Sequence, residues 1–203
     1  MSELDTDKRV EILGCAFDAW STDTTLARIE SLIDADGRAH LATVNVAILM
    51  MMRADQALAS YIAQSAMVVA DGQPLIWVSR YMKEPLPERV TGVDLVEALA
   101  ALAARKGWGV YLMGATREVV DKVAANLSMR YASLNLVGVD DGYFTEAEAG
   151  ERAQAIANSG AKILIAAMGV PRQEMFIQAQ WQALGVNFAI GVGGSFDVLA
   201  GVT

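Results

Sequence analysis

Hydrophobic and polar positions follow two different periods along this chain, and segments with one period alternate with segments with the other. Short apolar runs are typical of buried strands, and longer segments with apolar residues three or four positions apart are typical of helices. The clearest strand is 161–168, an almost continuous apolar run of the kind that is covered on both faces of a sheet. Such alternation predicts an α/β protein with a mostly parallel sheet and helices on both faces.

The pattern predicts six strands and six helices, beginning at residue 41. The expected strands are 41–44, 66–70, 110–114, 134–139, 161–168 and 186–190. The expected helices are 46–64, 74–81, 91–106, 117–131, 145–158 and 171–184. Asn45, Thr91 and Thr145 are suitable caps for the helices that follow them, Thr145 with Glu148 as a capping box. Met50, Met51 and Met52 fit core filling, because methionine packs irregular gaps.

Composition favours one globular domain. Of the 203 residues, 54% are hydrophobic and 20% are charged. The net charge of -8 disfavours nucleic acid as a partner and gives no support for adhesion to anionic lipid. Cys15 is the only cysteine, so no internal disulfide forms, which fits a reducing compartment, and we expect Cys15 to be a small buried residue.

Several kinds of site are excluded or disfavoured. With one Cys and one His, a Cys/His zinc site within one chain is excluded. A Ser-His-Asp triad would need His40, and no G-x-S-x-G elbow is present, so we expect His40 to be structural. A P-loop is absent, and Gly191-Val192-Gly193-Gly194 lacks the third glycine of a dinucleotide fingerprint. Asp34-Ala35-Asp36 precedes Gly37 and fits a turn, so no metal site is expected.

Membrane-spanning segments are not apparent in the sequence. Met1 to Val10 is acidic and polar, which is unlike a signal peptide. The longest apolar run, 44–52, is far shorter than the roughly 20 residues that span a bilayer. A peripheral role at a membrane stays open.

Polar residues gather where the predicted strands end. They are Thr43, Asn45, Asp71, Asp140, Asp141, Tyr143, Gln173, Glu174 and Asp197. The carboxyl ends of parallel strands meet at one edge of a sheet, so these side chains are expected to share a crevice. Each alone has a simpler explanation, such as a helix cap at Asn45 or a turn at Asp71-Gly72. The helix after Pro171 could hold an anion at its N-terminus, with Arg89 and Arg172 adding charge for a diphosphate.

In order along the chain, seven motifs resemble a known family. They are Thr43-x-Asn45, Ala70-Asp71-Gly72-x-Pro74, Glu88-Arg89-x-Thr91-Gly92-x-Asp94-Leu95, Gly114-Ala115, Asp141-Gly142-Tyr143-Phe144, Gly169-x-Pro171-x-Gln173-Glu174 and Gly191-x-Gly193-Gly194-x-Phe196-Asp197. This set resembles the WecG/TagA/CpsF glycosyltransferases, also called glycosyltransferase family 26, from about Thr43 to Gly201. One departure is Val44, where relatives often have proline.

The resemblance implies a Rossmann-like core and a bacterial enzyme at the inner face of the cytoplasmic membrane. Members transfer a sugar from a UDP-sugar to an undecaprenyl-diphosphate-linked saccharide, with inversion and without a required metal or cofactor. The family also has a basic C-terminal appendage that helps to complete the site and promotes membrane association. The resemblance thus implies that residues 1–203 are the core domain without that appendage, and that full-length members are cytoplasmic and peripheral to the membrane.

Roles for individual residues follow from the resemblance and from the strand-end positions. Asp71 is expected to be the general base that takes the proton of the acceptor hydroxyl. Thr43 would position the donor, and Asn45 would help to hold the substrate. The remaining substrate-binding candidates are Arg89 and Gln173 at the sugar or diphosphate, Tyr143 against uracil, Asp197 near the nucleoside, and Gly169 and Gly193 in the glycine turns.

Alternatives remain at this stage. The chain could be a UDP-sugar-binding module without turnover. A nicotinamide dehydrogenase on the same fold class is disfavoured by the absent fingerprint. N-acetylmannosamine, its uronic acid and glucose all occur as donor sugars in the family, and the sequence does not choose among them. It also leaves open the acceptor and whether the protein is a homo-oligomer.

Overall fold

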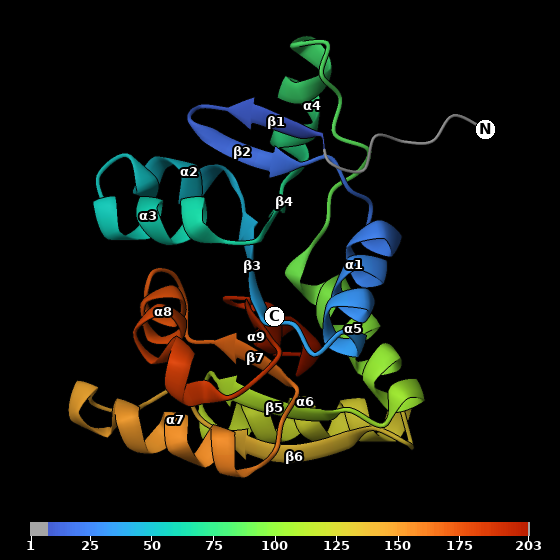
Figure 1. The fold of residues 1–203 in the computed structure, drawn as a ribbon, viewed down its shortest axis with the longest axis vertical. Coiled ribbons are helices and arrows are strands. Elements are labelled where there is room, and N and C mark those ends of the chain that lie inside the picture. Colours follow the sequence, from blue (N-terminus) through green and yellow to red (C-terminus); the bar gives the residue numbers. More distant parts are fainter. Residues whose placement is uncertain (1–7, 203) are drawn as a thin grey trace.

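A computed structural model describes residues 8–202, in which six parallel strands form one sheet in the order β4-β3-β8-β7-β5-β6 (Figure 1). The strands are β3 (Ala39–Val44), β4 (Met67–Ala70), β5 (Gly109–Gly114), β6 (Asn135–Asp140), β7 (Ile163–Ala167) and β8 (Phe188–Gly191). All neighbouring pairs are parallel. The predicted α/β class with a parallel sheet is confirmed.

Helices cover both faces of this sheet. They are α1 (Thr22–Asp34), α2 (Val46–Met52), α3 (Gln56–Gln64), α4 (Gln73–Tyr81), α5 (Gly92–Lys106), α6 (Arg117–Arg130), η1 (Glu146–Glu148), α7 (Ala149–Asn158), α8 (Arg172–Leu184) and α9 (Ser195–Leu199). Successive strand residues point to opposite faces, so Leu164 packs with α3, α7 and α8, whereas Ile163 packs with α1, α5 and α6. The result is a Rossmann-like single domain with a separate apolar core on each face.

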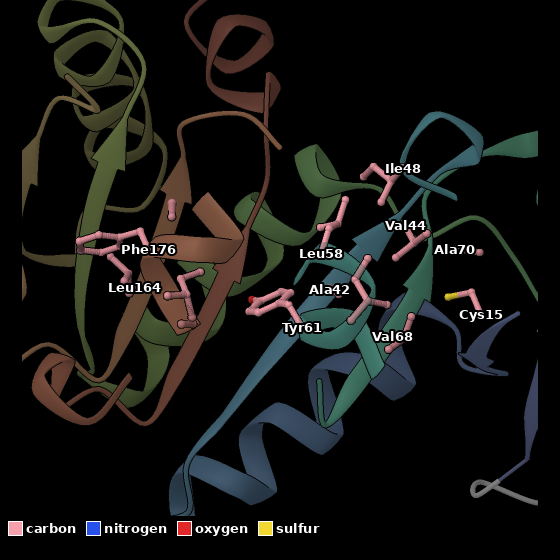
Figure 2. Packing of buried hydrophobic residues seen from close by; sticks show 14 of the residues in the cluster. Cys15, Ala42, Val44, Ile48, Leu58, Tyr61, Val68, Ala70, Leu164 and Phe176 are labelled. Carbon is pink, nitrogen blue, oxygen red and sulfur yellow. The ribbon is translucent and has the colours of Figure 1, made fainter. Parts of the chain in front are cut away.

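Tyr61 lies at the centre of one of these cores. Figure 2 shows its ring between Leu164 and Phe176 on one side and Ala42 and Leu58 on the other. The side chain is 1% exposed, and it connects the helices that follow β3 with those that follow β6 and β7.

Helix ends agree with the capping signals in the sequence. Asn45 accepts the backbone N–H of Ile48, and Thr91 accepts that of Asp94. The predicted capping box is present, since the Glu148 carboxylate accepts the backbone N–H of Thr145 at 2.7 Å. The predicted strands and helices from residue 66 onward agree with the structure to within about two residues at each end, except that the first turn of 145–158 is the 3-10 helix η1 and α7 begins at Ala149.

One predicted helix is wrong, because 46–64 is two helices. Both halves bury apolar residues, so the apolar spacing continues across the break and hides it. The break occurs because the Asp55 carboxylate accepts the backbone N–H groups of Ala57 and Leu58 and starts α3 anew. Met50 and Met51 are 43% and 36% exposed, so the core-filling expectation is wrong for both.

The sequence analysis missed the elements before residue 39. A two-stranded antiparallel hairpin of β1 (Arg9–Ile12) and β2 (Cys15–Asp18) precedes α1. Unlike the equally short β4 and β8, the strands β1 and β2 alternate buried residues with more exposed or polar ones, and neither is a continuous apolar run that would mark it. The buried Asp18 carboxylate accepts from Arg9 and from the backbone N–H of Val68, which ties the hairpin to the edge strand β4. The short helix α9 was missed as well.

Two expectations fall at the chain ends. Most of the polar stretch Met1 to Val10 and the position of Thr203 lie outside the described residues. Within residues 8–202, no single helix has the length and apolar character needed to cross a bilayer. Only α2 and α3 together meet that requirement, and they are bent by 117° relative to each other.

Candidate active site

Every strand of the sheet contributes residues to one crevice at its carboxyl edge. Across the sheet the order is Asp71 after β4, Thr43 and Asn45 from β3, Gly193 and Asp197 after β8, Gly169 and Gln173 after β7, Ala115 after β5, and Tyr143 after β6. The expectation that strand-end residues share a crevice is met for six of the nine, which line two neighbouring hollows, whereas Asp140, Asp141 and Glu174 line neither. The first hollow has a volume of about 360 Å³ and the second about 450 Å³. Both hollows are lined by Gly169, Gly193 and Gly194. The two hollows therefore join at these glycine turns and form one cleft.

Asp71 lies in the second hollow, where the protein holds its carboxylate in place. The backbone N–H of Gly92 donates to Asp71 Oδ2 at 3.2 Å. Burial raises the pKa of Asp71, and the Gly92 N–H and the charge of Arg89 oppose that rise. Arg89 itself lines neither hollow, although its charge acts on Asp71. Asp71 is thus a partly buried carboxyl with a raised affinity for a proton, which is what a general base requires.

Thr43 and Asn45 line the same hollow from the end of β3. The Thr43 hydroxyl donates to the Gly191 carbonyl at 3.2 Å, so its oxygen can still accept a bond from a ligand. Asn45 uses Oδ1 to cap α2, accepting from Ile48 at 3.0 Å. That bond leaves the Asn45 amide Nδ2 for a substrate.

Gln173 lies in the floor of the cleft, where its side chain joins two strand ends. It is 1% exposed, and its Oε1 accepts the backbone N–H of Met168 at 3.2 Å and that of Gly193 at 3.0 Å. Its Nε2 donates to Glu174 Oε1 at 2.8 Å. These bonds fix the glycine turn after β8, and a direct contact between Gln173 and a sugar stays a prediction.

Glu174 is a buried acid that sequence reasoning left without a role. It is 7% exposed, burial raises its pKa, and its Oε2 has no hydrogen-bond partner within the described part of the chain. The sequence showed only a glutamate in the first turn of a helix, which normally faces water.

Gly191 packs closely against Gln173 beneath the cleft. A Cβ there would lie 2.6 Å from Gln173 Nε2, so a side chain would displace the amide that holds the turn. Gly193 has φ +52, a left-handed conformation that glycine adopts without strain, and its N–H points to Gln173.

The first hollow contains the residues expected at the nucleoside. Tyr143 and Asp197 line it together with Arg172. Tyr143 is 69% exposed, so its ring is available for stacking. Arg172 donates to the Phe144 carbonyl at 2.7 Å, and its guanidinium lies 4.9 Å from the centre of the Phe144 ring.

Other polar residues named in the sequence analysis form hydrogen bonds, ion pairs or ring contacts within the protein. Asp140 accepts from the Tyr111 hydroxyl and pairs with Arg152 at 2.9 Å. His40 stacks on Tyr61 near the start of β3, away from the cleft. Asp34 ends α1 and pairs with Lys106. Within residues 8–202, no three His, Cys, Asp or Glu side chains group in a way that could hold a metal ion.

Cys15 is buried, as expected, and burial raises the pKa of its thiol to about 12. A thiol with such a pKa carries almost no thiolate at neutral pH, which makes it unreactive.

Apolar residues that the sequence analysis did not name also line the second hollow. They include Ile48 and Met51 from α2, Val93 from α5 and Val198 from α9. Apolar side chains at helix ends look like ordinary core in a sequence, so no signal could have assigned them to a cleft.

The fold and cleft place this protein among the α/β proteins that bind ligands at the carboxyl edge of a parallel sheet. Residues 10–203 match the Glycosyl transferase WecG/TagA/CpsF family, and the chain belongs to that family. It is also 30% identical over 169 residues to the N-acetylglucosaminyldiphosphoundecaprenol N-acetyl-beta-D-mannosaminyltransferase of Bacillus subtilis (strain 168). The match covers 83% of this chain and 65% of that relative, so this chain spans about two thirds of the relative's length.

Proposed function

We propose that this glycosyltransferase transfers a sugar from a UDP-sugar to a saccharide on undecaprenyl diphosphate, with inversion at the anomeric carbon. The observation that carries the proposal is the partly buried Asp71 carboxylate in a hollow that shares its glycine turns with a second, nucleotide-sized hollow. The name of the Bacillus subtilis relative supports an N-acetylglucosamine acceptor and an N-acetylmannosamine donor sugar.

The transfer step uses one base. The acceptor hydroxyl attacks C1 of the donor sugar from the face opposite the diphosphate, and its proton passes to the Asp71 carboxylate. The bond between C1 and the phosphate oxygen breaks, and UDP leaves with the electron pair. A base of this kind contributes roughly 10²–10⁴-fold to the rate.

The donor occupies the hollow lined by Tyr143 and Asp197 in this proposal. Tyr143 stacks on the uracil, and Asp197 contacts the nucleoside. The diphosphate lies beside Gly169 and Gly193 at the N-terminus of α8, where the positive end of the helix dipole favours an anion. The donor sugar then reaches the second hollow, where Thr43 and Asn45 hold it near Asp71.

The acceptor is a lipid, so we propose that the enzyme works at the cytoplasmic face of the bacterial membrane. The apolar residues Met51 and Val198 line the hollow that contains Asp71, which is compatible with an acceptor that continues into a polyprenyl chain.

The test is a transfer assay with a polyprenyl-diphosphate N-acetylglucosamine acceptor and UDP-linked N-acetylmannosamine, N-acetylmannosaminuronic acid or glucose. We expect UDP-N-acetylmannosamine to be consumed fastest, with a product of inverted anomeric configuration by NMR. A retained configuration would contradict the proposed step.

A binding module without turnover is the second candidate for a chain that spans only part of its relative. Calorimetric binding of UDP with no transfer to any acceptor would favour it. Absence of both UDP binding and transfer would reject the two candidates together.

A further inference from the structure

Helix α4 is apolar on the side that faces the solvent as well as on the side that faces the core. Leu75, Ile76 and Ser79 are buried. The opposite side presents five exposed apolar residues, which we call the α4 face: Pro74, Trp77, Val78, Tyr81 and Met82. Trp77 is 62% exposed and Tyr81 is 90% exposed. Tyr81 is therefore more exposed than any other large apolar or aromatic side chain described in residues 8–202.

The spacing of the α4 face is that of a packing surface. Its residues follow each other at three and four positions, which is the stripe that a helix normally turns toward a core. A helix that is apolar all round is covered in folded proteins. Figure 1 shows α4 at one end of the molecule, beyond the β1–β2 hairpin. The fold of residues 8–202 itself thus leaves this stripe uncovered.

The aromatic residues of the stripe match the interface of a bilayer. Trp and Tyr are the residues enriched at the level of lipid headgroups. Helix α4 has one basic residue, Arg80, and no acid, and the exposed Lys83 follows it. The nearest acids along the chain are Asp71, two residues before the helix, and Glu84, directly after Lys83. The charges beside the stripe therefore balance, in a chain whose net charge is -8.

The position of α4 connects this surface to the candidate base. The helix starts at Gln73, two residues after Asp71, and its cap Gly72 packs against Asn45. Trp77 is four residues into the helix, so it lies only about 6 Å along the axis from Gln73. An interfacial helix buries its apolar face by roughly 5–10 Å. A helix lying in the headgroup layer would therefore hold Asp71 beside that layer, where the diphosphate of a lipid-linked acceptor also lies.

Helix α2 carries a second group of exposed apolar residues. It starts after Asn45, at the end of the strand next to β4, and exposes Val46, Met50 and Met51. Met51 also lines the hollow that contains Asp71. Exposed apolar side chains of α2 therefore reach the site itself.

We propose that the α4 face is a membrane-docking surface that lies in the headgroup region of a bilayer and brings the Asp71 hollow to the level of the acceptor diphosphate. The proposal rests on the proposed function for the nature of the acceptor, but docking itself can be measured without turnover. An apolar face of this kind could also be covered by a second copy of the chain. The experiments below distinguish binding to a bilayer from self-association.

The first experiment measures contact between Trp77 and lipid. The protein is mixed with vesicles of phosphatidylglycerol whose acyl chains carry bromine, which quenches nearby tryptophan fluorescence. Of the four tryptophans, Trp20 and Trp108 are buried and Trp181 is partly buried, so Trp77 is the exposed reporter. We expect quenching in the wild type that is largely lost in Trp77→Phe. Equal quenching of both proteins, or none in either, overturns the proposal.

The second experiment measures binding by co-sedimentation with vesicles. The double variant Trp77→Glu, Tyr81→Glu changes two exposed side chains, and we expect its affinity for anionic vesicles to fall by roughly tenfold or more. Met129→Glu is the matched control, because Met129 is 77% exposed on α6, and it should bind like the wild type. Equal loss in both variants overturns the proposal. So does self-association without lipid that the double variant abolishes, because a second copy then covers the α4 face.

Transfer rates with two acceptors test the docking surface separately from the proposed function. With a short-chain, water-soluble acceptor, the double variant should match the wild type, since the α4 face lies outside the cleft. With a long-chain acceptor in vesicles its rate should fall in step with vesicle binding. Lipid binding by the α4 face in a protein without transfer activity would keep the docking surface and reject the reaction. Transfer to the vesicle-borne acceptor at an unchanged rate would keep the reaction and reject the docking surface.

Discussion

Asp71 combines partial burial with a backbone hydrogen bond from Gly92, and its replacement by asparagine keeps the shape of the site while removing the proton acceptor. We expect Asp71→Asn to lower kcat by roughly 10²–10⁴-fold and to leave the affinity for UDP nearly unchanged. Steady-state kinetics and UDP titration calorimetry measure the two quantities. Full turnover by a folded Asp71→Asn protein would show that another group takes the proton.

The pH dependence of the reaction provides a separate test at the same carboxyl. A general base acts when ionised, so kcat/KM rises with pH through the pKa of Asp71, which burial raises and Arg89 lowers. Without the Arg89 charge the pKa rises further, and the acidic limb of the profile for Arg89→Gln should shift to higher pH. Arg89→Lys keeps the charge and serves as the control. An acidic limb at the same pH in both variants would separate Arg89 from Asp71.

Glu174 gives a prediction about stability. Burial raises the pKa of Glu174 in the folded protein above the ordinary value of 4.5, which applies to the unfolded chain. At a pH between the ordinary and the raised pKa, the folded protein therefore holds a proton that the unfolded chain has lost. Stability therefore falls as pH rises from 4.5 through the raised pKa, and the loss persists above it. Glu174→Gln keeps an acceptor for Gln173 and removes the charge, so it should gain about 1 kcal/mol at neutral pH and little in acid.

Urea unfolding of the wild type and of Glu174→Gln at acidic and neutral pH measures this difference. Glu118→Gln is the control, because Glu118 is exposed and its pKa is lowered by Lys122. A gain for Glu174→Gln that is the same at both pH values would point to packing and away from charge.

For single residues, the sequence could predict where Asp71, Thr43 and Asn45 would lie, because a strand end has a defined place in a parallel sheet. It could not predict that the Gln173 amide would face two backbone N–H groups. It also could not predict that Glu174 would be buried, since both facts depend on how α8 rotates against α3.

Among the helices, α2 depends on a residue that is also a substrate-binding candidate. Asn45→Ser keeps a capping oxygen and removes the free amide, whereas Asn45→Ala removes both. We expect Asn45→Ser to weaken donor or acceptor binding with little change in melting temperature, and Asn45→Ala to lose about 1 kcal/mol of stability as well. Substrate KM values and calorimetric melting separate the two effects. Equal KM values in Asn45→Ser and the wild type would limit Asn45 to its capping role.

The elements that the sequence predicted correctly have an uninterrupted apolar pattern and a clear end. Helix α5 has a capping threonine, a long apolar stripe and Gly107 at its end, and β7 is apolar throughout. The break before α3 depends on one side chain, Asp55, inside a continuous apolar stripe. The β1–β2 hairpin is held by Asp18, whose partners Arg9 and Val68 are recognised only in three dimensions.

For the molecule as a whole, we predict that activity does not require a metal ion. The described residues contain no group of three acidic, Cys or His side chains that could hold one. Transfer in EDTA should therefore equal transfer in buffer, as a direct comparison of initial rates would show. Loss of activity on chelation, restored by Mg²⁺ or Mn²⁺, would instead assign a diphosphate-bound cation to the leaving group.

The order of the strands has a consequence for synthesis on the ribosome. Strand β8 is the last strand to emerge, yet it lies between β3 and β7 in the finished sheet. Until Phe188–Gly191 leaves the exit tunnel, the nascent chain holds two incomplete sheets, β3 with β4 and β7 with β5 and β6. Each incomplete sheet has an apolar edge without a partner, which favours pairing with other chains. A pause in translation after β7 has left the tunnel and before β8 has done so would therefore expose this protein to aggregation more than an earlier pause.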